Sequence, residues 1–220
     1  YTLNDNSRFT QIATDGGFLN APVEMESLIL SPGERAEIVV DFSRYENGES
    51  VYLDVNQYSG GLYHAIRFEA DGEQGVETKL PDRLNTIIPI PEEDSERTRV
   101  FNMETGMMGV FRINGKAMDM NRIDVRIPLG ATEIWEVKNV PMGMMNIPHS
   151  FHVHDVQFQI LDIDGDNPPA YLAGWKDTVL VWPGETVRFI ARYEDFTGLY
   201  MYHCHLLVHE DQGMMGQFEV

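Results

Sequence analysis

Six of the seven histidines lie in two short segments, and their spacing strongly constrains how the chain can fold. They are His149, His152 and His154 in HSFHVH, and His203, His205 and His209 in HCHLLVH. The only cysteine, Cys204, lies inside the second segment, and Met214 follows ten residues later. On a β-strand alternate side chains face opposite sides, so each His-x-His pair presents two imidazoles to one side. Two such pairs on neighbouring strands predict four imidazoles around one small volume, which suits a cluster of metal ions better than a single ion.

Cys204 should face the opposite side of its strand from its two histidine neighbours. His149 and His209 flank the two His-x-His pairs, so both are expected to join Cys204 there. One thiolate, two imidazoles and a weak axial thioether from Met214 form the trigonal ligand set of a blue copper site. Zinc fits less well, since structural zinc sites favour paired CxxC spacing and only one thiolate is present. The tripeptide 203–205 would then link a mononuclear copper to a metal cluster by a short covalent path.

The rest of the sequence has the pattern of an all-β protein, with alternating or β-branched segments and no long helical periodicity. The clearest strands are predicted at residues 36–42, 50–55, 132–138, 158–163 and 186–193. Residues 79–98 contain three prolines and an acidic cluster, which indicates a connector between domains. About 120 residues follow it, enough for a complete β-sandwich, whereas the roughly 80 residues before it are few for one.

Composition argues against two classes of partner. The chain has 35 acidic and 16 basic side chains, a formal net charge of −19 and no Lys/Arg-rich stretch, so nucleic acid is not expected to bind. The negative net charge would attract cations, including metal ions, although a large net charge also keeps ordinary proteins in solution. No apolar stretch approaches the roughly 18 to 20 residues that a membrane span requires, so no membrane-spanning segment is expected.

The pattern HxxHxH followed by HCHxxxHxxxxM resembles the C-terminal domain of the multicopper oxidase family. The segments GWKDTV, HEDQGMMGQFEV, ATDGGFLNAPV and LSPGERAEIVVDF resemble its bacterial cuprous oxidase, bilirubin oxidase and laccase-like branch. The resemblance implies cupredoxin-like Greek-key β-sandwiches. Residues 1–80 would be part of a middle domain, residues 81–98 the connector, and residues 99–220 a complete C-terminal domain.

The same resemblance implies a role for each ligand. Type 1 copper would be bound by His149, Cys204, His209 and, axially, Met214. The cluster ligands would be His152 for type 2 copper and His154, His203 and His205 for the type 3 pair. Glu210, next to a ligand, would relay protons to the oxygen site.

The cluster of the family takes eight histidines, four of them from an N-terminal domain, and this chain supplies four. His64 is not expected to be a ligand. The first residues read as the middle of a domain, so a first domain or a partner chain is expected to supply the other four histidines. This chain alone is then not expected to reduce dioxygen. A partial middle domain would also leave sheet edges exposed, which predicts self-association.

In the complete enzyme, a small reducing substrate would lose one electron at a time at type 1 copper, and four electrons would reduce dioxygen to water. Thioethers suit Cu(I), so Met142, Met144 and Met145 predict a cuprous docking site, although methionines also fill core gaps or line adaptable pockets. Relatives that oxidise cuprous ion carry an acid and a Met immediately before the first type 1 histidine, where this chain has Ile147 and Pro148. Phenols, aromatic amines and bilirubin-like pigments therefore stay open as substrates.

Three other functions are consistent with parts of the pattern. A copper-binding or electron-transfer module without an oxygen-reducing cluster is disfavoured by the mid-domain start. A metal-free scaffold of the same fold is disfavoured by the intact ligands, and a copper nitrite reductase by the two histidines that flank Cys204. Relatives mostly act outside the cytoplasm, so the resemblance implies an extracytoplasmic location, in the periplasm or at the cell surface.

Overall fold

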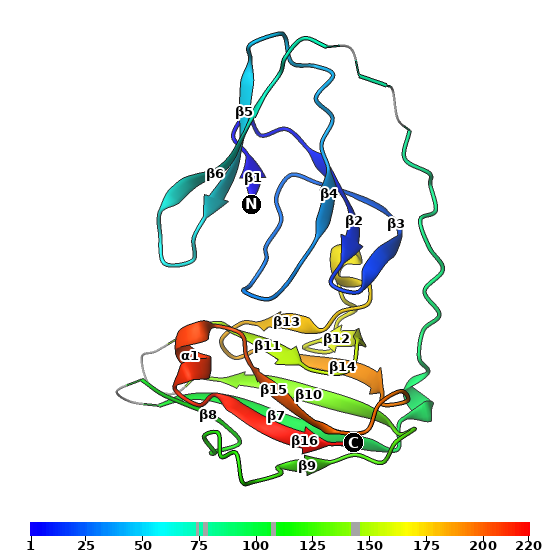
Figure 1. Cartoon of the computed structure of the whole chain (residues 1–220), viewed down its shortest axis with the longest axis vertical. Helices are drawn as coiled ribbons and strands as arrows, with labels where there is room; N and C mark the ends of the chain where they lie inside the picture. Colours follow the sequence, from blue (N-terminus) through cyan, green and yellow to red (C-terminus); the bar gives the residue numbers. More distant parts are fainter. Residues whose placement is uncertain (74, 77–78, 107–108, 142–145) are drawn as a thin grey trace.

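The computed structural model describes residues 1–73, 75–76, 79–106, 109–141 and 146–220, and it confirms the all-β prediction. The described residues form four sheets in two parts that stack along the long axis of the molecule (Figure 1). Strands β1 to β6 form the first part and strands β7 to β16 the second. No helix of the described residues has the length and apolar character that crossing a membrane requires.

The first part consists of two three-stranded sheets. One has the order β1-β5-β6, with β1 at Thr2–Leu3, β5 at Ser50–Asn56 and β6 at Leu62–Glu69. The other has the order β3-β2-β4, with β2 at Phe9–Thr14, β3 at Gly17–Met25 and β4 at Glu37–Val39. Four fully buried side chains form its core, namely Leu3, Phe9, Leu28 and Val51.

The second part is a sandwich of two five-stranded sheets. The first sheet has the order β12-β14-β10-β7-β8, with bounds Phe158–Ile163, Thr186–Arg192, Thr132–Val140, Arg97–Gly106 and Val110–Ile113. The second has the order β13-β11-β15-β16-β9, with bounds Thr178–Val181, His149–Val153, Leu199–Cys204, Met215–Glu219 and Val125–Arg126. Aromatic rings fill the space between them, with Trp135 lying 4.4 Å from Phe101 and 6.2 Å from Phe151 between ring centroids. Aromatic burial on this scale contributes much of the stability of such a core.

The segment between the two parts is bound to the sandwich. Ile90 packs against Ile134 and Ile190 on the outer face of the first sheet. The amide of Gln159 accepts a hydrogen bond from the Ile90 N–H at 2.8 Å and donates one to the carbonyl of Ile88 at 2.9 Å. A short 3-10 helix, η1 (Glu92–Asp94), precedes β7. Because this segment covers Ile134 on β10 and Ile190 on β14, both side chains are buried although they lie on the outer face.

Most predicted strands match, and the differences have local causes. The prediction for 158–163 coincides with β12, whereas that for 36–42 shortens to β4 at Glu37–Val39. β4 is an edge strand that pairs with β2, and beyond it Asp41 accepts the N–H of Ser43 in a turn. β7 begins at Arg97, two residues before the expected start of the second domain, because it pairs with β10 from Glu133 onward.

Candidate metal centre

Two strands of the second sheet, together with the residue that follows each, carry most of the predicted ligands. β11 and β15 are antiparallel neighbours, with Phe151 opposite Cys204 and His152 opposite His203. Because side chains alternate along a strand, Cys204 points into the sandwich core, while His152 and His203 point the other way. The pairing therefore sorts the predicted ligands into two groups on opposite sides of one sheet.

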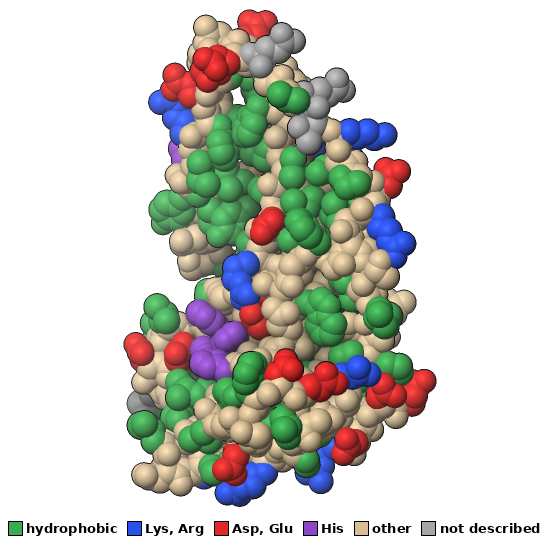
Figure 2. All heavy atoms as spheres, turned by 45° about the vertical axis from the view of Figure 1, so that its right-hand side comes forward, with side chains coloured by type: hydrophobic (Ala, Val, Ile, Leu, Met, Phe, Trp, Pro, Cys, Tyr) green, Lys and Arg blue, Asp and Glu red, His purple; other side chains and the backbone are tan. Residues whose placement is uncertain are grey.

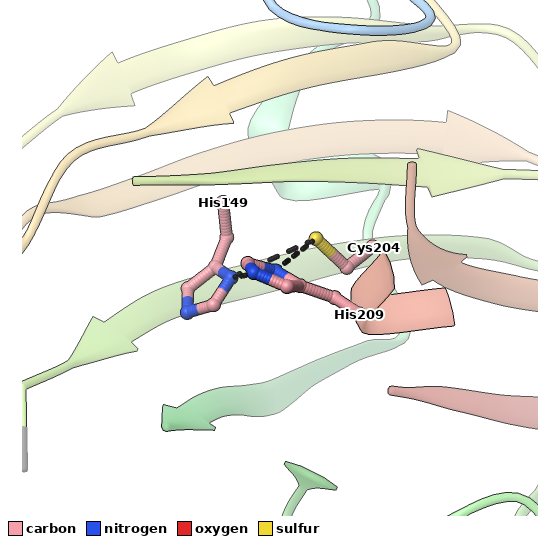
Figure 3. Close-up of side chains that lie close together, drawn as sticks. All are labelled: His149, Cys204 and His209. Atoms are coloured by element: carbon pink, nitrogen blue, oxygen red, sulfur yellow. Dashed lines mark hydrogen bonds between the residues drawn. The ribbon is translucent and has the colours of Figure 1, made fainter. Parts of the chain in front are cut away.

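The first group consists of His149, Cys204 and His209, all of which are buried (Figure 3). The Cys204 Sγ lies 3.6 Å from His149 Nδ1 and 3.4 Å from His209 Nδ1. The two Nδ1 atoms lie 3.2 Å apart. A first-row metal ion forms bonds of about 2.0 to 2.3 Å to nitrogen and sulfur, so donors that share one ion at angles near 100 to 120° lie roughly 3.1 to 3.8 Å apart. The three atoms therefore fit a single such ion.

Neighbouring side chains orient the two imidazoles. The Nε2 of His149 lies 3.0 Å from the hydroxyl of Thr105 on β7, deep in the core. A proton on Nε2 that is donated to this hydroxyl leaves the Nδ1 lone pair directed at Cys204. The ring of Phe111 on β8 stacks on His209 with a centroid distance of 3.9 Å and an interplanar angle of 21°. No sequence motif pointed to Thr105 or Phe111, since both contacts depend on how β7 and β8 pack.

Burial sets the protonation of this group. Desolvation lowers the pKa of His149 to about 3 and that of His209 to about 4, so both imidazoles are neutral at pH 7. Desolvation raises the pKa of the Cys204 thiol to about 11, although it accepts hydrogen bonds from the backbone of Leu206 and Ser150. Neutral imidazoles are ready to bind a metal, whereas the thiol must lose its proton when the metal enters.

Met214 lies fully buried in the same core cluster as Cys204. Its carbonyl accepts the N–H of Cys204 at 3.0 Å, and its N–H donates to the carbonyl of His209 at 2.9 Å. The short helix α1 (Leu207–Asp211) and the turn after it bring the chain back to β15 at this point. The backbone thus holds Met214 next to two members of the first group.

The second group contains four imidazoles. Ring centroids of His152 lie 5.0 Å from His154, 5.2 Å from His203 and 5.5 Å from His205. The Nε2 atoms of His154 and His203 lie 3.2 Å apart. Histidine side chains reach the surface where the two parts of the molecule meet (Figure 2). Four imidazoles that converge so closely suit more than one metal ion.

Two features of this second group fit metal ligands. Desolvation lowers the pKa of His203 to about 4 and also lowers that of His154. Among the described residues, the buried Nδ1 of His205 has no hydrogen-bond partner. Buried nitrogen atoms rarely stay unpaired in native proteins. A metal ion bound by the cluster would give this nitrogen a role as a ligand or bring it a partner.

A backbone carbonyl, a hydroxyl and a carboxylate lie next to the Nδ1 atoms of two of these imidazoles. The His152 Nδ1 lies 2.9 Å from both the carbonyl of Asp177 and the hydroxyl of Thr178. Glu210, expected from the sequence to act on protons, has its Oε2 3.3 Å from the Nδ1 of His203 and is partly exposed. Asp177 lies in the GWKDTV segment, so its position was marked in the sequence, although its contact with His152 was not.

The remaining sequence predictions fall elsewhere. His64 pairs with Asp54 across β5 and β6, with a distance of 2.6 Å between Nδ1 and Oδ1, and joins neither histidine group among the described residues. Met142, Met144 and Met145, the predicted cuprous docking residues, lie outside the described residues.

Comparison with known proteins gives consistent results. The family model described as multicopper oxidase matches residues 92–220. The chain is 35% identical over 225 residues to the multicopper oxidase mco of Staphylococcus haemolyticus, covering 99% of this chain and 44% of that protein. It is 33% identical over 228 residues to the bilirubin oxidase of Albifimbria verrucaria, covering 96% of this chain and 39% of that protein.

A solved structure is similar over the whole chain. It is the laccase-like multicopper oxidase CueO of Ochrobactrum sp., a protein described as having oxidase activity towards lignin model compounds and lignosulfonate. The TM-score is 0.87 at 37% identity, covering 100% of this chain and 52% of that one. The chain thus spans about half the length of the proteins it matches.

Proposed function

Because the chain belongs to the multicopper oxidase family, with copper as its cofactor, we propose that it is the C-terminal part of an oxidase that couples substrate oxidation to dioxygen reduction. A reducing substrate gives up electrons singly, and four electrons with four protons convert one dioxygen into two waters. When bound, copper supplies the one-electron redox chemistry of both half-reactions.

One observation carries this proposal. Cys204 belongs to the buried group, and its direct neighbours His203 and His205 belong to the cluster of four imidazoles. The two sites are therefore joined through a single tripeptide, which provides a covalent route for electrons between them. A metal-free scaffold would not need a thiol and two neutral imidazoles buried within 3.2 to 3.6 Å of one another. An electron-transfer module would not need a second, separate cluster of imidazoles.

The residues would divide as follows. The type 1 ligands in this proposal are His149, Cys204, His209 and the axial Met214. The type 2 ligand is His152, and the type 3 ligands are His154, His203 and His205. Glu210 would hold a proton next to His203, in reach of its Nδ1 at 3.3 Å. Replacement by Gln should then slow turnover in the complete enzyme while leaving its copper content unchanged.

We further propose that four more histidines complete the cluster, from a first domain or a partner chain. His152, His154 and His205 are only partly buried, and the histidine patch is open at the surface (Figure 2). Residues 1–80 would then be part of a middle domain, 81–98 the connector and 99–220 the last domain. An extracytoplasmic location, in the periplasm or at the cell surface, is part of this proposal and rests on the family.

The proposed substrates are small and readily oxidised, because a Met axial ligand stabilises Cu(II) and so holds the potential of the copper down. Phenols and aromatic amines are supported by the laccase-like relatives, and bilirubin-like pigments by the bilirubin oxidase. Cuprous ion is the alternative, and its proposed docking residues are the methionines between Pro141 and Asn146.

Copper reconstitution of the 220-residue chain tests the proposal. An intense visible thiolate-to-copper band is expected, without oxygen uptake when a phenol or a cuprous salt is added. Oxygen uptake by the chain alone would show that the additional histidines come from a second copy. Stoichiometric copper binding without the band would refute the assignment of Cys204.

A further inference from the structure

A turn of the first part, residues 31–35, meets the metal centre of the second part. The side chain of Ser150, which lies between His149 and His152 on β11, donates a hydrogen bond to the carbonyl of Pro32 at 2.6 Å. Its hydroxyl also lies 2.8 Å from that of Ser31. The backbone of the same serine accepts the N–H of His205 at 2.7 Å. The turn therefore contacts the strand from which ligands of both groups extend.

Gly33 in this turn packs directly on a cluster imidazole. An added Cβ at Gly33 would lie 2.6 Å from Cδ2 and 2.7 Å from Cγ of His205. The backbone there has a φ of +88°, a conformation that favours glycine. Since no side chain fits between the turn and the ring, the backbone of Gly33 forms a wall that limits how the imidazole of His205 can turn.

Arg35 reaches the second imidazole through Asp177. Its guanidinium binds both carboxylate oxygens of Asp177, at 2.5 and 2.6 Å. The Oδ1 of Asp177 accepts the hydroxyl of Thr178 at 2.8 Å and lies 3.5 Å from the His152 Nδ1. Burial would raise the pKa of Asp177, but the hydrogen bonds from Arg35 and Thr178 help to lower it below its usual range. A bidentate pair of this kind fixes direction as well as distance.

A buried ion pair network fixes the turn itself. Lys176 is 1% exposed, and its Nζ lies 3.0 Å from Asp15 and 3.2 Å from Glu34. Glu34 in turn accepts both the N–H and the hydroxyl of Ser31 at 2.8 Å. Breaking such a network leaves buried charge without a partner, so the two parts have one strongly preferred arrangement at this point.

We propose that the turn at residues 31–35 is a positioning element for the imidazole cluster, in which Gly33 sets the ring of His205 and Arg35 sets that of His152 through Asp177. The inference rests on the proposed copper function, because it concerns how the cluster ligands are aimed. It assigns the first part of the chain a specific task beyond covering the sandwich.

The test compares Gly33→Ala, Arg35→Gln and Arg35→Lys in the full chain. Arg8→Gln is the matched control, because Arg8 is about as exposed as Arg35 and also binds two carboxylates, but its partners Glu24 and Glu26 are exposed whereas Asp177 is largely buried. Copper at Cys204 is followed by its visible band, and further copper by chelator competition. Ring ¹⁵N resonances of the histidines are recorded in the metal-free chain.

We expect copper binding beyond the first equivalent to weaken about 10 to 100-fold in Gly33→Ala and Arg35→Gln, as for other residues that orient metal ligands. Arg35→Lys should fall between Arg35→Gln and the unaltered chain, and Arg8→Gln should match the unaltered chain. The visible band should persist in all four variants. In the metal-free chain, the ring resonances of His205 should shift in Gly33→Ala and those of His152 in Arg35→Gln, with His149 and His209 unchanged.

The outcomes separate this inference from the proposed function. Absence of the visible band in the unaltered chain refutes the copper assignment, while the ring resonances still decide the role of the turn. Unchanged resonances of His152 and His205 in both variants overturn the inference, as does equal copper affinity beyond the first equivalent. If Gly33→Ala does not fold, the visible band will be lost, and the two Arg35 variants then decide.

Discussion

Copper binding to the Cys204 group should release one proton over a wide range of pH. The ligand form of the site requires a thiolate and two neutral imidazoles. Burial lowers the pKa of His149 to about 3 and of His209 to about 4, and raises that of Cys204 to about 11. Between these limits both imidazoles are already neutral and the thiol still carries its proton.

The sign and size of the pH effect follow from these values. As pH rises, the thiol proton is displaced more easily, so apparent copper affinity increases by about tenfold, or about 1.4 kcal/mol, per pH unit. The slope should stay near one proton from about pH 5 to pH 9. If both histidines instead kept the ordinary pKa near 6.5, nearly three protons would be released at about pH 5.

The assay is calorimetry with one equivalent of Cu(I) in several buffers that differ in their heat of ionisation. Proton release per bound ion is read from how the heat varies between buffers. A value near one at both acidic and neutral pH agrees with the buried site. A value that climbs toward three below pH 6.5 would refute the claim that burial keeps His149 and His209 neutral.

The other predictions concern stability, ligand orientation, potential and association. Lys176→Met should destabilise the chain by about 3 to 5 kcal/mol, because it removes the buried ammonium that the carboxylates of Asp15 and Glu34 share, whereas Lys138→Met, at a half-exposed ion pair, should cost at most about 1 kcal/mol. Urea unfolding compares the two variants, and equal losses would contradict the network. Thr105→Val removes the hydroxyl that contacts His149 Nε2, and it should weaken copper binding at Cys204 about 10 to 100-fold. An unchanged copper affinity in chelator competition would show that this contact does not orient the imidazole ring. Met214→Leu should cost less than about 1.5 kcal/mol of stability and raise the copper potential in a redox titration, and a lowered potential would argue against an axial thioether. β6 exposes Leu62, Tyr63 and Ile66 on the edge of its sheet, so sedimentation should show self-association at micromolar concentration, and a strict monomer would argue against it.

Local spacing was enough to predict which histidines gather with Cys204 and which gather on the other side of the sheet. A strand has a period of two, so the order His203, Cys204, His205 already places the thiol on the opposite side from its neighbours. Alternation and turn residues likewise predicted the all-β class and the bounds of β12, because both depend on near neighbours in the chain.

Contacts across large sequence separations were not predictable, because nothing local encodes them. Thr105 lies 44 residues from His149 in the chain, and Arg35 lies 142 residues from Asp177. The tautomer of His149, the lowered pKa of both type 1 imidazole candidates and the wall at Gly33 all depend on which elements pack together. The sequence by itself therefore determined which side chains are candidate metal ligands and on which side of a strand each one lies. Only the tertiary structure decided how deeply they are buried and what aims them, because desolvation and packing arise only when distant segments meet.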